Sequence, residues 1–447
     1  MEAATAARPQ ASSGASSSAR PPAVGLPRTL QTARFLVRPV AFFEHYRREL
    51  GPTFAARLLG PGDVVFISDA DSVKRLFGAD RVNTIAPGRN IVLRPLLGGQ
   101  SLLLQEGEDH LRRRKLMLPP FHGERMRAYE EAIAAVTEAE IATWPRERSF
   151  SIHPHMQAIT LEVILRAVFG VSDPARRDAL TGSLVAILAE SASPAAIGLV
   201  FPGVRRLPRF RAFARMLERT DALLAEEIAE RRADPDLESR DDILSMLVAA
   251  RFEDGSRMSD TELRDQLMTL LLAGHETTAT GLAWTFDLLL HRRDALERLV
   301  GELDSGESEY LDAVIEESLR VRPVVPMTGR LLKEPASLGG YDLDRGTVIL
   351  VAIYMTHTDP DLYPDPHAFR PERFLDADPG TYSWIPFGGG TRRCIGAAFA
   401  QMEMRVVLRT ILERFELRAA SPEPERPIRR NVTLSPRGGT RVIATPR

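Results

Sequence analysis

One cysteine is present among the 447 residues, and it lies in a glycine-rich segment that could present its sulfur to a ligand. Cys394 is part of FGGGTRRCIG, residues 387 to 396, in which three consecutive glycines let the backbone turn tightly. Helix-forming sequence begins just after the cysteine, and the positive end of a helix dipole lowers the pKa of a nearby thiol. The segment therefore predicts a thiolate that is presented to a ligand at close range. The alternative is a buried structural cysteine in a glycine turn.

A second set of reactive side chains lies within a long apolar segment. Its sequence is AGHETT, residues 273 to 278, with a carboxylate at Glu276 and a hydroxyl at Thr277. The small residues Ala273 and Gly274 leave room for a flat group beside the helix, and a threonine inside a helix can bond to a preceding carbonyl. Buried polar groups are costly unless they are hydrogen-bonded. The segment therefore indicates either a functional site or a satisfied polar kink in the core.

The segment FGGGTRRCIG matches the pattern F-x-x-G-x-R-x-C-x-G at every fixed position, and in this it resembles the cytochromes P-450. The resemblance covers residues 40 to 445, with the motifs in the family's order. It implies haem b, iron protoporphyrin IX, as the cofactor, with Cys394 as the axial iron ligand. Thiolate ligation of haem iron favours cleavage of the O–O bond. The resemblance also implies that three further residues lie against the haem: Ala273, Phe387 and Gly396.

The same resemblance gives roles to other polar residues. Glu276 and Thr277 match positions implicated in proton delivery and in stabilising iron-bound dioxygen. The segment EESLR carries Glu317 and Arg320 at a spacing of three residues, which alone would indicate a solvated surface pair. The resemblance instead implies that these two residues and Arg373, in FRPERF, form a buried network that supports the cysteine loop.

Haem carries two propionates, so the resemblance implies that basic residues converge on the cofactor from distant parts of the chain. Four residues match such positions: His110, Arg114, Arg330 and Arg392. His110 and Arg114 are four residues apart on one face of an expected helix. Taken alone, His110 would more often be an ordinary surface or core histidine.

The residues around these motifs predict a mainly α protein with small β-sheets. The longest helix is expected from Ser259 to His291, because Ser259 and Glu262 form a capping box. At 1.5 Å per residue this helix would be about 48 Å long, enough to cross a domain. The region from 106 to 232 has a 3.6-residue period broken by prolines, which indicates packed helices. The resemblance implies the cytochrome P-450 fold, a triangular helical prism with a long central helix over the haem.

Several shorter elements are also expected. A β-hairpin should turn at residues 60–62, and a strand should cover TVILVAIYM, residues 347–355. A last helix should run from Gly396 to Glu413.

The amino-terminal segment differs in composition from the rest of the chain. Residues 1–28 are rich in Ala, Ser, Pro and Arg and lack apolar periodicity, so we expect a disordered tail followed by a single catalytic domain over residues 29–447. An organelle transit peptide has a similar composition, which is a minor alternative to the expected cytoplasmic location.

Composition excludes several classes of protein. The 60 acidic and 58 basic residues give a net charge of −2, so nucleic acid is not an expected partner. The 44% of hydrophobic residues and 26% of charged residues are typical of a soluble globular protein. No run of about 18 apolar residues exists, so no membrane anchor is expected. A lone cysteine excludes an intramolecular disulfide and fits a reducing compartment.

The expected reaction inserts one oxygen atom from O2 into a lipophilic substrate, as a hydroxylation or an epoxidation. Fatty acids, terpenoids, steroids and macrolides are the expected substrate classes. The predicted pocket is mostly apolar and contains Ala273, Val324, Val325, Met327 and Leu434.

Electrons should come from a separate donor of the ferredoxin or flavodoxin type with its own reductase, because no segment is left over for a flavin or a nicotinamide. An acidic donor would dock on a local basic face formed by Arg112, Arg113, Lys115 and Arg405, and the alternative is that these residues form an ordinary solvated surface. Two other classes stay open: a peroxygenase or isomerase that uses no external electrons, and a non-catalytic haem protein that senses or stores a ligand.

Overall fold

The structure is a computed structural model that describes residues 20–80, 84–85, 93–121, 125–170, 174–191, 208–376, 379–430 and 432–447. Its helices are α1 (Arg28–Val37), α2 (Pro39–Leu50), α3 (Ala70–Gly78), α4 (Arg94–Leu97), α5 (Gly107–Met117), α6 (Arg125–Ile141), α7 (His153–Ile164), α8 (Pro174–Ser191), α10 (Pro208–Ala233), α11 (Ile243–Ala249), α12 (Asp260–Leu290), α13 (Arg293–Ser305), α14 (Glu309–Val321), α15 (Ile353–His357), α16 (Arg373–Asp376) and α17 (Ala397–Arg414).

The strands are short and form small sheets. They are β1 (Phe54–Leu58), β2 (Gly62–Ile67), β3 (Thr84–Ile85), β4 (Ser149–Ser151), β5 (Thr328–Leu332), β6 (Ala336–Leu338), β7 (Tyr341–Leu343), β8 (Val348–Val351), β9 (Phe415–Ala419), β10 (Pro427–Arg430), β11 (Thr433–Pro436) and β12 (Arg441–Pro446). The prediction of a mainly α protein with small sheets is therefore confirmed. No helix in the described part of the chain is both long and apolar enough to cross a membrane.

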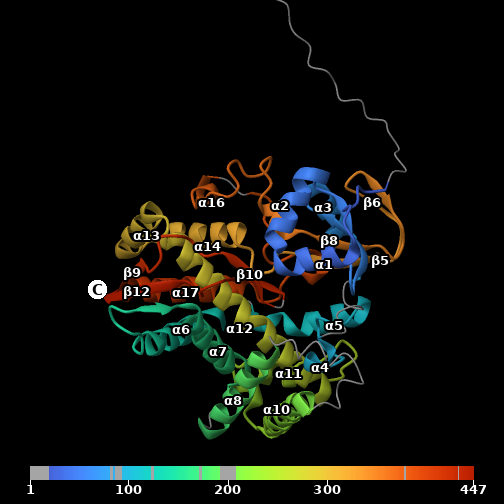
Figure 1. Ribbon diagram of the computed structural model, residues 1–447. Coiled ribbons are helices and arrows are strands. Elements are labelled where there is room, and N and C mark those ends of the chain that lie inside the picture. The colour runs from blue at the N-terminus through green and yellow to red at the C-terminus, as the bar shows by residue number, and fades with distance from the viewer. Residues whose placement is uncertain are drawn as a thin grey trace, which may run out of the picture.

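The long helix α12 crosses the middle of the molecule (Figure 1). It begins where predicted, because the Ser259 hydroxyl accepts the Glu262 N–H at 3.2 Å and the Glu262 carboxylate accepts the Ser259 N–H at 2.9 Å. Most of its residues are buried, and it packs against α7, α10, α14, α17 and β11. A side chain in the middle of α12 that is still accessible to solvent therefore lies inside the molecule and not on its outer surface.

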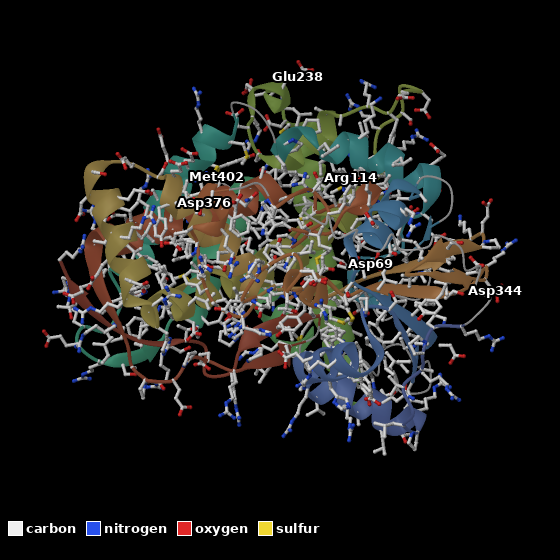
Figure 2. The ribbon with its side chains drawn as sticks, turned by 90° about the horizontal axis from the view of Figure 1, so that it is seen from above. Asp69, Arg114, Glu238, Asp344, Asp376 and Met402 are labelled. Carbon is white, nitrogen blue, oxygen red and sulfur yellow. The ribbon has the colours of Figure 1, made fainter. Side chains whose placement is uncertain are left out.

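The largest sheet lies at one end of the molecule, beside α1, α2 and α3 (Figure 1). Its strand order is β1-β2-β8-β5-β3, in which β1 and β2 form the predicted hairpin and β2 runs parallel to β8. Phe54 pairs with Phe66 across the hairpin, and both pack in an aromatic cluster with Phe42 and Phe43 of α2. Near Asp344, which follows β7, the molecule reaches its outer edge (Figure 2).

Two boundaries predicted from the sequence are wrong. Within the predicted tail, residues 1–19 lie outside the described residues, but from residue 20 the chain is part of the fold: Val24 is buried and its N–H bonds to the Ala55 carbonyl at 2.9 Å. The strand predicted over residues 347–355 ends at Val351. The Ala352 N–H still bonds to the Ile67 carbonyl of β2 at 2.9 Å. The chain then turns into α15, whose Tyr354 N–H bonds to the Pro326 carbonyl at 3.0 Å.

Candidate active site

The cysteine loop, residues 387–396, contains two glycines, Gly389 and Gly390, that cannot be replaced without collision. The Cys394 N–H bonds to the Phe387 carbonyl at 2.9 Å, which closes the loop. Gly390 has a φ of +66°, and a Cβ there would lie 2.0 Å from the Asp80 carboxylate. A Cβ at Gly389 would lie 2.3 Å from the Phe77 ring. The glycines therefore let the loop lie directly against the end of α3.

Cys394 lies just before α17, as predicted, and part of its surface is exposed. Burial of the thiol among protein atoms raises the pKa of Cys394 above its ordinary value, against the opposing effects of the Gly396 N–H, Arg114 and Arg393. The predicted lowering of this pKa at the helix start is thus outweighed by desolvation. A bound metal ion would displace the thiol proton, because the thiolate is the ligand.

The four predicted propionate ligands converge around the cysteine loop. His110 and Arg114 come from α5, Arg330 from β5, and Arg392 from the turn before Cys394; Arg114 is labelled in Figure 2. Burial and then the charges of Arg392, Arg114 and Arg330 lower the pKa of His110 to about 4. Burial and then Arg330 lower the pKa of Arg392 to about 10. These groups therefore lie close enough to repel one another.

Only part of this positive charge is compensated within the cluster. Arg330 forms a buried ion pair with Asp80, N to O 2.8 Å, and also donates to the Gly389 carbonyl at 3.1 Å. Asp80 in turn accepts the Thr391 N–H at 3.1 Å, so it anchors the loop as well. An anion among Arg114, Arg330 and Arg392 would relieve the remaining repulsion. A thiol beside cations that favour carboxylates fits haem, in which iron and two propionates belong to one molecule.

The middle of α12 is open on one side at the predicted position. Ala273 is exposed, and the Thr277 hydroxyl donates to the Ala273 carbonyl at 2.6 Å. This is the hydrogen bond to a preceding carbonyl that the sequence predicts. Gly274 has another role, because a Cβ there would lie 2.7 Å from Ile164 on α7. Ala273 thus faces open space, whereas Gly274 permits close packing of α12 on α7.

Glu276 and Thr277 have different surroundings. The Glu276 carboxylate accepts from the Gln157 amide of α7 at 2.5 Å and from the Thr280 hydroxyl at 3.5 Å. His153 Nε2, also on α7, lies 3.8 Å from the same carboxylate. Burial raises the pKa of Glu276, and the bond from Gln157 opposes this effect. Among the described residues, no hydrogen bond joins Glu276 to Thr277.

The predicted Glu-Arg-Arg set is brought together. The Arg320 guanidinium binds the Glu317 carboxylate at 2.6 and 2.8 Å, and both side chains are completely buried. Arg373 Nε lies 3.4 Å from Glu317. Arg320 also donates to the carbonyls of His357 and Pro366 at 2.7 Å and of Ala368 at 3.1 Å. The ion pair therefore holds α14 against the segment between α15 and α16.

His357 extends this network to the cysteine loop, and sequence reasoning missed it. Its carbonyl accepts from Arg320, while its ring Nε2 accepts the Ile385 N–H at 2.9 Å. Burial and the charge of Arg320 lower the pKa of His357 to about 3, so the ring is neutral and Nε2 can accept. Nearby, Trp384 donates to the Glu316 carbonyl at 3.1 Å. A lone histidine near an apolar run gives no signal of such a role.

Glu403 on α17 was also missed. It is buried, and burial raises its pKa to about 8, against the effect of a hydrogen bond with Thr278 of α12. Its Oε1 has no hydrogen-bond partner among the described residues. Figure 2 labels its neighbour Met402. A signal existed in the sequence, because Glu403 falls four residues after Phe399 on the apolar face of the predicted helix.

The predicted pocket residues divide into two groups. Val324 and Leu434 are buried, and the Leu434 N–H bonds to the Val324 carbonyl at 2.8 Å, so β11 does lie beside the segment that follows α14. Val325 and Met327 are partly exposed, and Ala273 is exposed. Of the predicted pocket residues, only these three present substantial apolar surface to a ligand.

The predicted basic face needs correction. Each of its four residues has an acidic partner within the chain: Arg112 with Asp254 at 2.5 Å, Arg113 with Glu262 at 2.7 Å, Lys115 with Glu253 at 2.6 Å and Arg405 with Asp312 at 2.6 Å. The face therefore carries paired charges instead of a positive excess.

A hollow of about 770 Å³ lies beside the cysteine loop, lined by Trp384, Phe387, Arg393 and the backbone of residues 388–390.

Known proteins resemble this chain over nearly its whole length. A family model described as Cytochrome P450 matches residues 28–442. The putative cytochrome P450 135B1 of Mycobacterium tuberculosis is 42% identical over 437 residues, which are 96% of this chain and 92% of that protein. The putative cytochrome P450 137 of the same organism is 41% identical, over 95% of this chain and 91% of that protein.

A solved structure agrees with the fold. Retinoic acid bound cyanobacterial CYP120A1 matches with a TM-score of 0.83 and 29% identity, over 96% of this chain and 99% of that chain. The match confirms the fold class expected from the sequence, with its long central helix and small sheets. The residues matched by the family model include Cys394, Glu317 and Arg320. The chain belongs to the cytochrome P450 family, whose members are haem-iron monooxygenases.

Proposed function

We propose that the chain binds haem b through Cys394 and inserts one oxygen atom from O2 into a C–H or C=C bond of a lipophilic substrate. The observation that carries this proposal is the partly exposed residue Cys394 beside the mutually repelling cations Arg114, Arg330 and Arg392. The thiol can hold the iron, and the cations can hold two propionates. Haem, when bound, supplies the iron at which O2 is reduced.

Glu276 and Thr277, on α12, would hold and deliver protons. The Thr277 hydroxyl donates its hydrogen bond to the Ala273 carbonyl, so Oγ1 can still accept a hydrogen bond on the open side of the helix. The raised pKa of Glu276 favours the protonated acid, from which a proton can be donated. Because Glu276 is bound to Gln157, its delivery of a proton toward Thr277 requires that this bond be released or bridged by water.

The substrate and the electron donor are proposed on separate grounds. Ala273, Val325 and Met327 offer apolar surface, which favours a lipophilic substrate such as a fatty acid, terpenoid, steroid or macrolide, and the similar structure binds retinoic acid. Family members receive electrons from a redox partner. A ferredoxin or flavodoxin type donor with its reductase would dock at the hollow beside the cysteine loop.

The mycobacterial relatives and the lone cysteine support a cytoplasmic location and give no support to organelle targeting.

The ligand assignment can be tested by absorption spectroscopy. The reduced, CO-bound protein should show the red-shifted Soret band of thiolate ligation. Cys394→His should lose that band, whereas Ile395→Val, a conservative change next to the cysteine, should keep it. Retention of the band in Cys394→His would refute the assignment. A screen of lipophilic compounds for a change in iron spin state would then identify the substrate class, and turnover with peroxide alone would favour a peroxygenase instead.

A further inference from the structure

A row of buried hydroxyl groups leads from Glu276 to the protein surface at the turn between β10 and β11. The Thr280 hydroxyl lies 3.5 Å from the Glu276 carboxylate and 3.4 Å from the Ser435 hydroxyl. Ser435 is in turn 3.4 Å from the Thr433 hydroxyl, which donates to the Arg430 carbonyl at 2.9 Å. The row therefore joins the middle of α12 to a strand that is distant in the sequence.

Burial and surroundings set this row apart from ordinary surface hydroxyls. Thr280 and Ser435 are completely inaccessible to solvent, and Thr433 is 3% exposed, whereas the neighbouring Val432 is 58% exposed. Buried hydroxyls are costly unless they are hydrogen-bonded, so three in contact are not explained by packing alone. The row begins one residue from exposed surface and ends at Glu276, the carboxylate to which we assign proton delivery.

A hydroxyl group can accept one proton and donate another, so a row of them can pass a proton along without net change. We propose that Thr433, Ser435 and Thr280 form the route by which a proton from solvent reaches the Glu276 carboxylate, an inference that rests on the proposed role of Glu276. Each hydroxyl takes up one proton and gives up one, and the net transfer is from water to Glu276. The separations of 3.4–3.5 Å are long for hydroxyl pairs, so transfer needs a small approach of the groups. It also needs the Thr433 hydroxyl to release the Arg430 carbonyl and turn its hydrogen toward Ser435.

Other groups around Glu276 offer competing routes. On α7, Gln157 donates to the carboxylate, and His153 lies 3.3 Å from the Thr280 hydroxyl. Burial, Arg430 and His275 lower the pKa of His153 to about 4, so this imidazole seldom carries a proton near neutral pH. Gln157 has no proton to give. The positive charge of Arg430, on β10, favours the ionised form of Glu276, but burial outweighs it and raises the pKa of this carboxyl.

The test measures protonation of Glu276 directly. After a rapid drop in pH, infrared spectroscopy of the haem-loaded protein follows the band of the protonated carboxyl, which Glu276→Gln identifies by its loss. We expect Thr280→Val and Ser435→Ala to slow the rise of this band by about tenfold or more, with the same final amplitude. Thr285→Val is the matched control, because Thr285 is also buried on α12 but, within the described parts of the chain, its hydroxyl bonds only to the Gly281 carbonyl of its own helix.

Each result has a definite reading. Equal rates in parent, Thr280→Val and Ser435→Ala would overturn the route, since Glu276 would then take protons directly from solvent. Slowing by His153→Leu alone would overturn it in favour of the imidazole. Product yield per electron consumed tests the role of Glu276 separately. If Glu276→Gln leaves that yield unchanged, the proposed function of Glu276 fails, while the infrared rates still decide whether the hydroxyl row conducts.

Discussion

Replacing Glu403 by glutamine removes one ionisable group from the interface between α17 and α12 while keeping the size of the side chain. In the folded protein burial raises the pKa of this carboxyl from 4.5 to about 8. Between these two pH values the folded state keeps a proton that the unfolded chain has lost. The contribution of this carboxyl to the free energy of unfolding is therefore fully present below pH 4.5 and is lost as the pH rises through about 8. Glutamine has no such dependence.

The size of the effect follows from the shift in the pKa. One unit corresponds to about 1.4 kcal/mol, so between pH 5 and pH 9 the parent should lose about 4 kcal/mol of unfolding free energy that Glu403→Gln does not lose. For a chain of 447 residues this corresponds to a difference of about 4 °C in the change of Tm. The absolute Tm of the variant is less informative, because the amide also lacks a full set of hydrogen-bond partners.

The assay is a series of thermal melts of parent and variant at one scan rate from pH 5 to pH 9, followed by tryptophan fluorescence and by the Soret band. Glu413→Gln is the control, because Glu413 is an exposed carboxylate on the same helix. The parent and Glu413→Gln should lose stability together, while Glu403→Gln follows a flatter curve. Parallel curves for the parent and Glu403→Gln would refute the argument that this carboxyl is held neutral by burial.

Three further outcomes are expected. Glu317→Ala leaves the buried Arg320 charge unpaired, at a cost of about 3–5 kcal/mol, so purified protein should contain little haem; a normal haem content and Tm would contradict this. Thr277→Ala should keep haem content and the substrate-induced spin change but release more hydrogen peroxide per reductant oxidised, and unchanged coupling would remove Thr277 from proton delivery. His357→Phe removes the acceptor for the Ile385 N–H, at a cost of about 1–3 kcal/mol, and should speed loss of haem to an acceptor protein.

Local chemistry explains why some features were predictable from sequence. The start of α12 depends on the contact between Ser259 and Glu262, three residues apart, so the sequence alone locates it. Cys394 and the glycines of its loop are likewise close together in the sequence, so the pattern can be recognised without the fold. The end of the strand at Val351 is different, because the chain then turns so that the Tyr354 N–H meets the Pro326 carbonyl, and this contact is not visible in the local pattern.

Contacts between distant segments account for what sequence reasoning missed. Glu276 is bound by Gln157, a residue 119 positions earlier, so no spacing rule could pair them. Sequence adjacency suggested that Glu276 and Thr277 act side by side. Consecutive residues on a helix point about 100° apart, however, so one can meet α7 while the other lies on the open side. The prediction of a basic face at Arg112 was wrong for a similar reason, because its acidic partner Asp254 lies 142 residues away in the sequence.

The cationic cluster and the cysteine each carry an energetic cost that one ligand can relieve. Arg392 and Arg330 repel each other and lower the pKa of His110, while burial keeps a proton on Cys394. A metal ion alone would remove the thiol proton but increase the repulsion, and an anion alone would do the reverse. A ligand that carries both the metal and two carboxylates relieves both costs at once. Because such a ligand binds the folded state alone, it adds its binding energy to the stability of the cysteine loop. Defects in the support at Glu317 should therefore appear first as loss of haem.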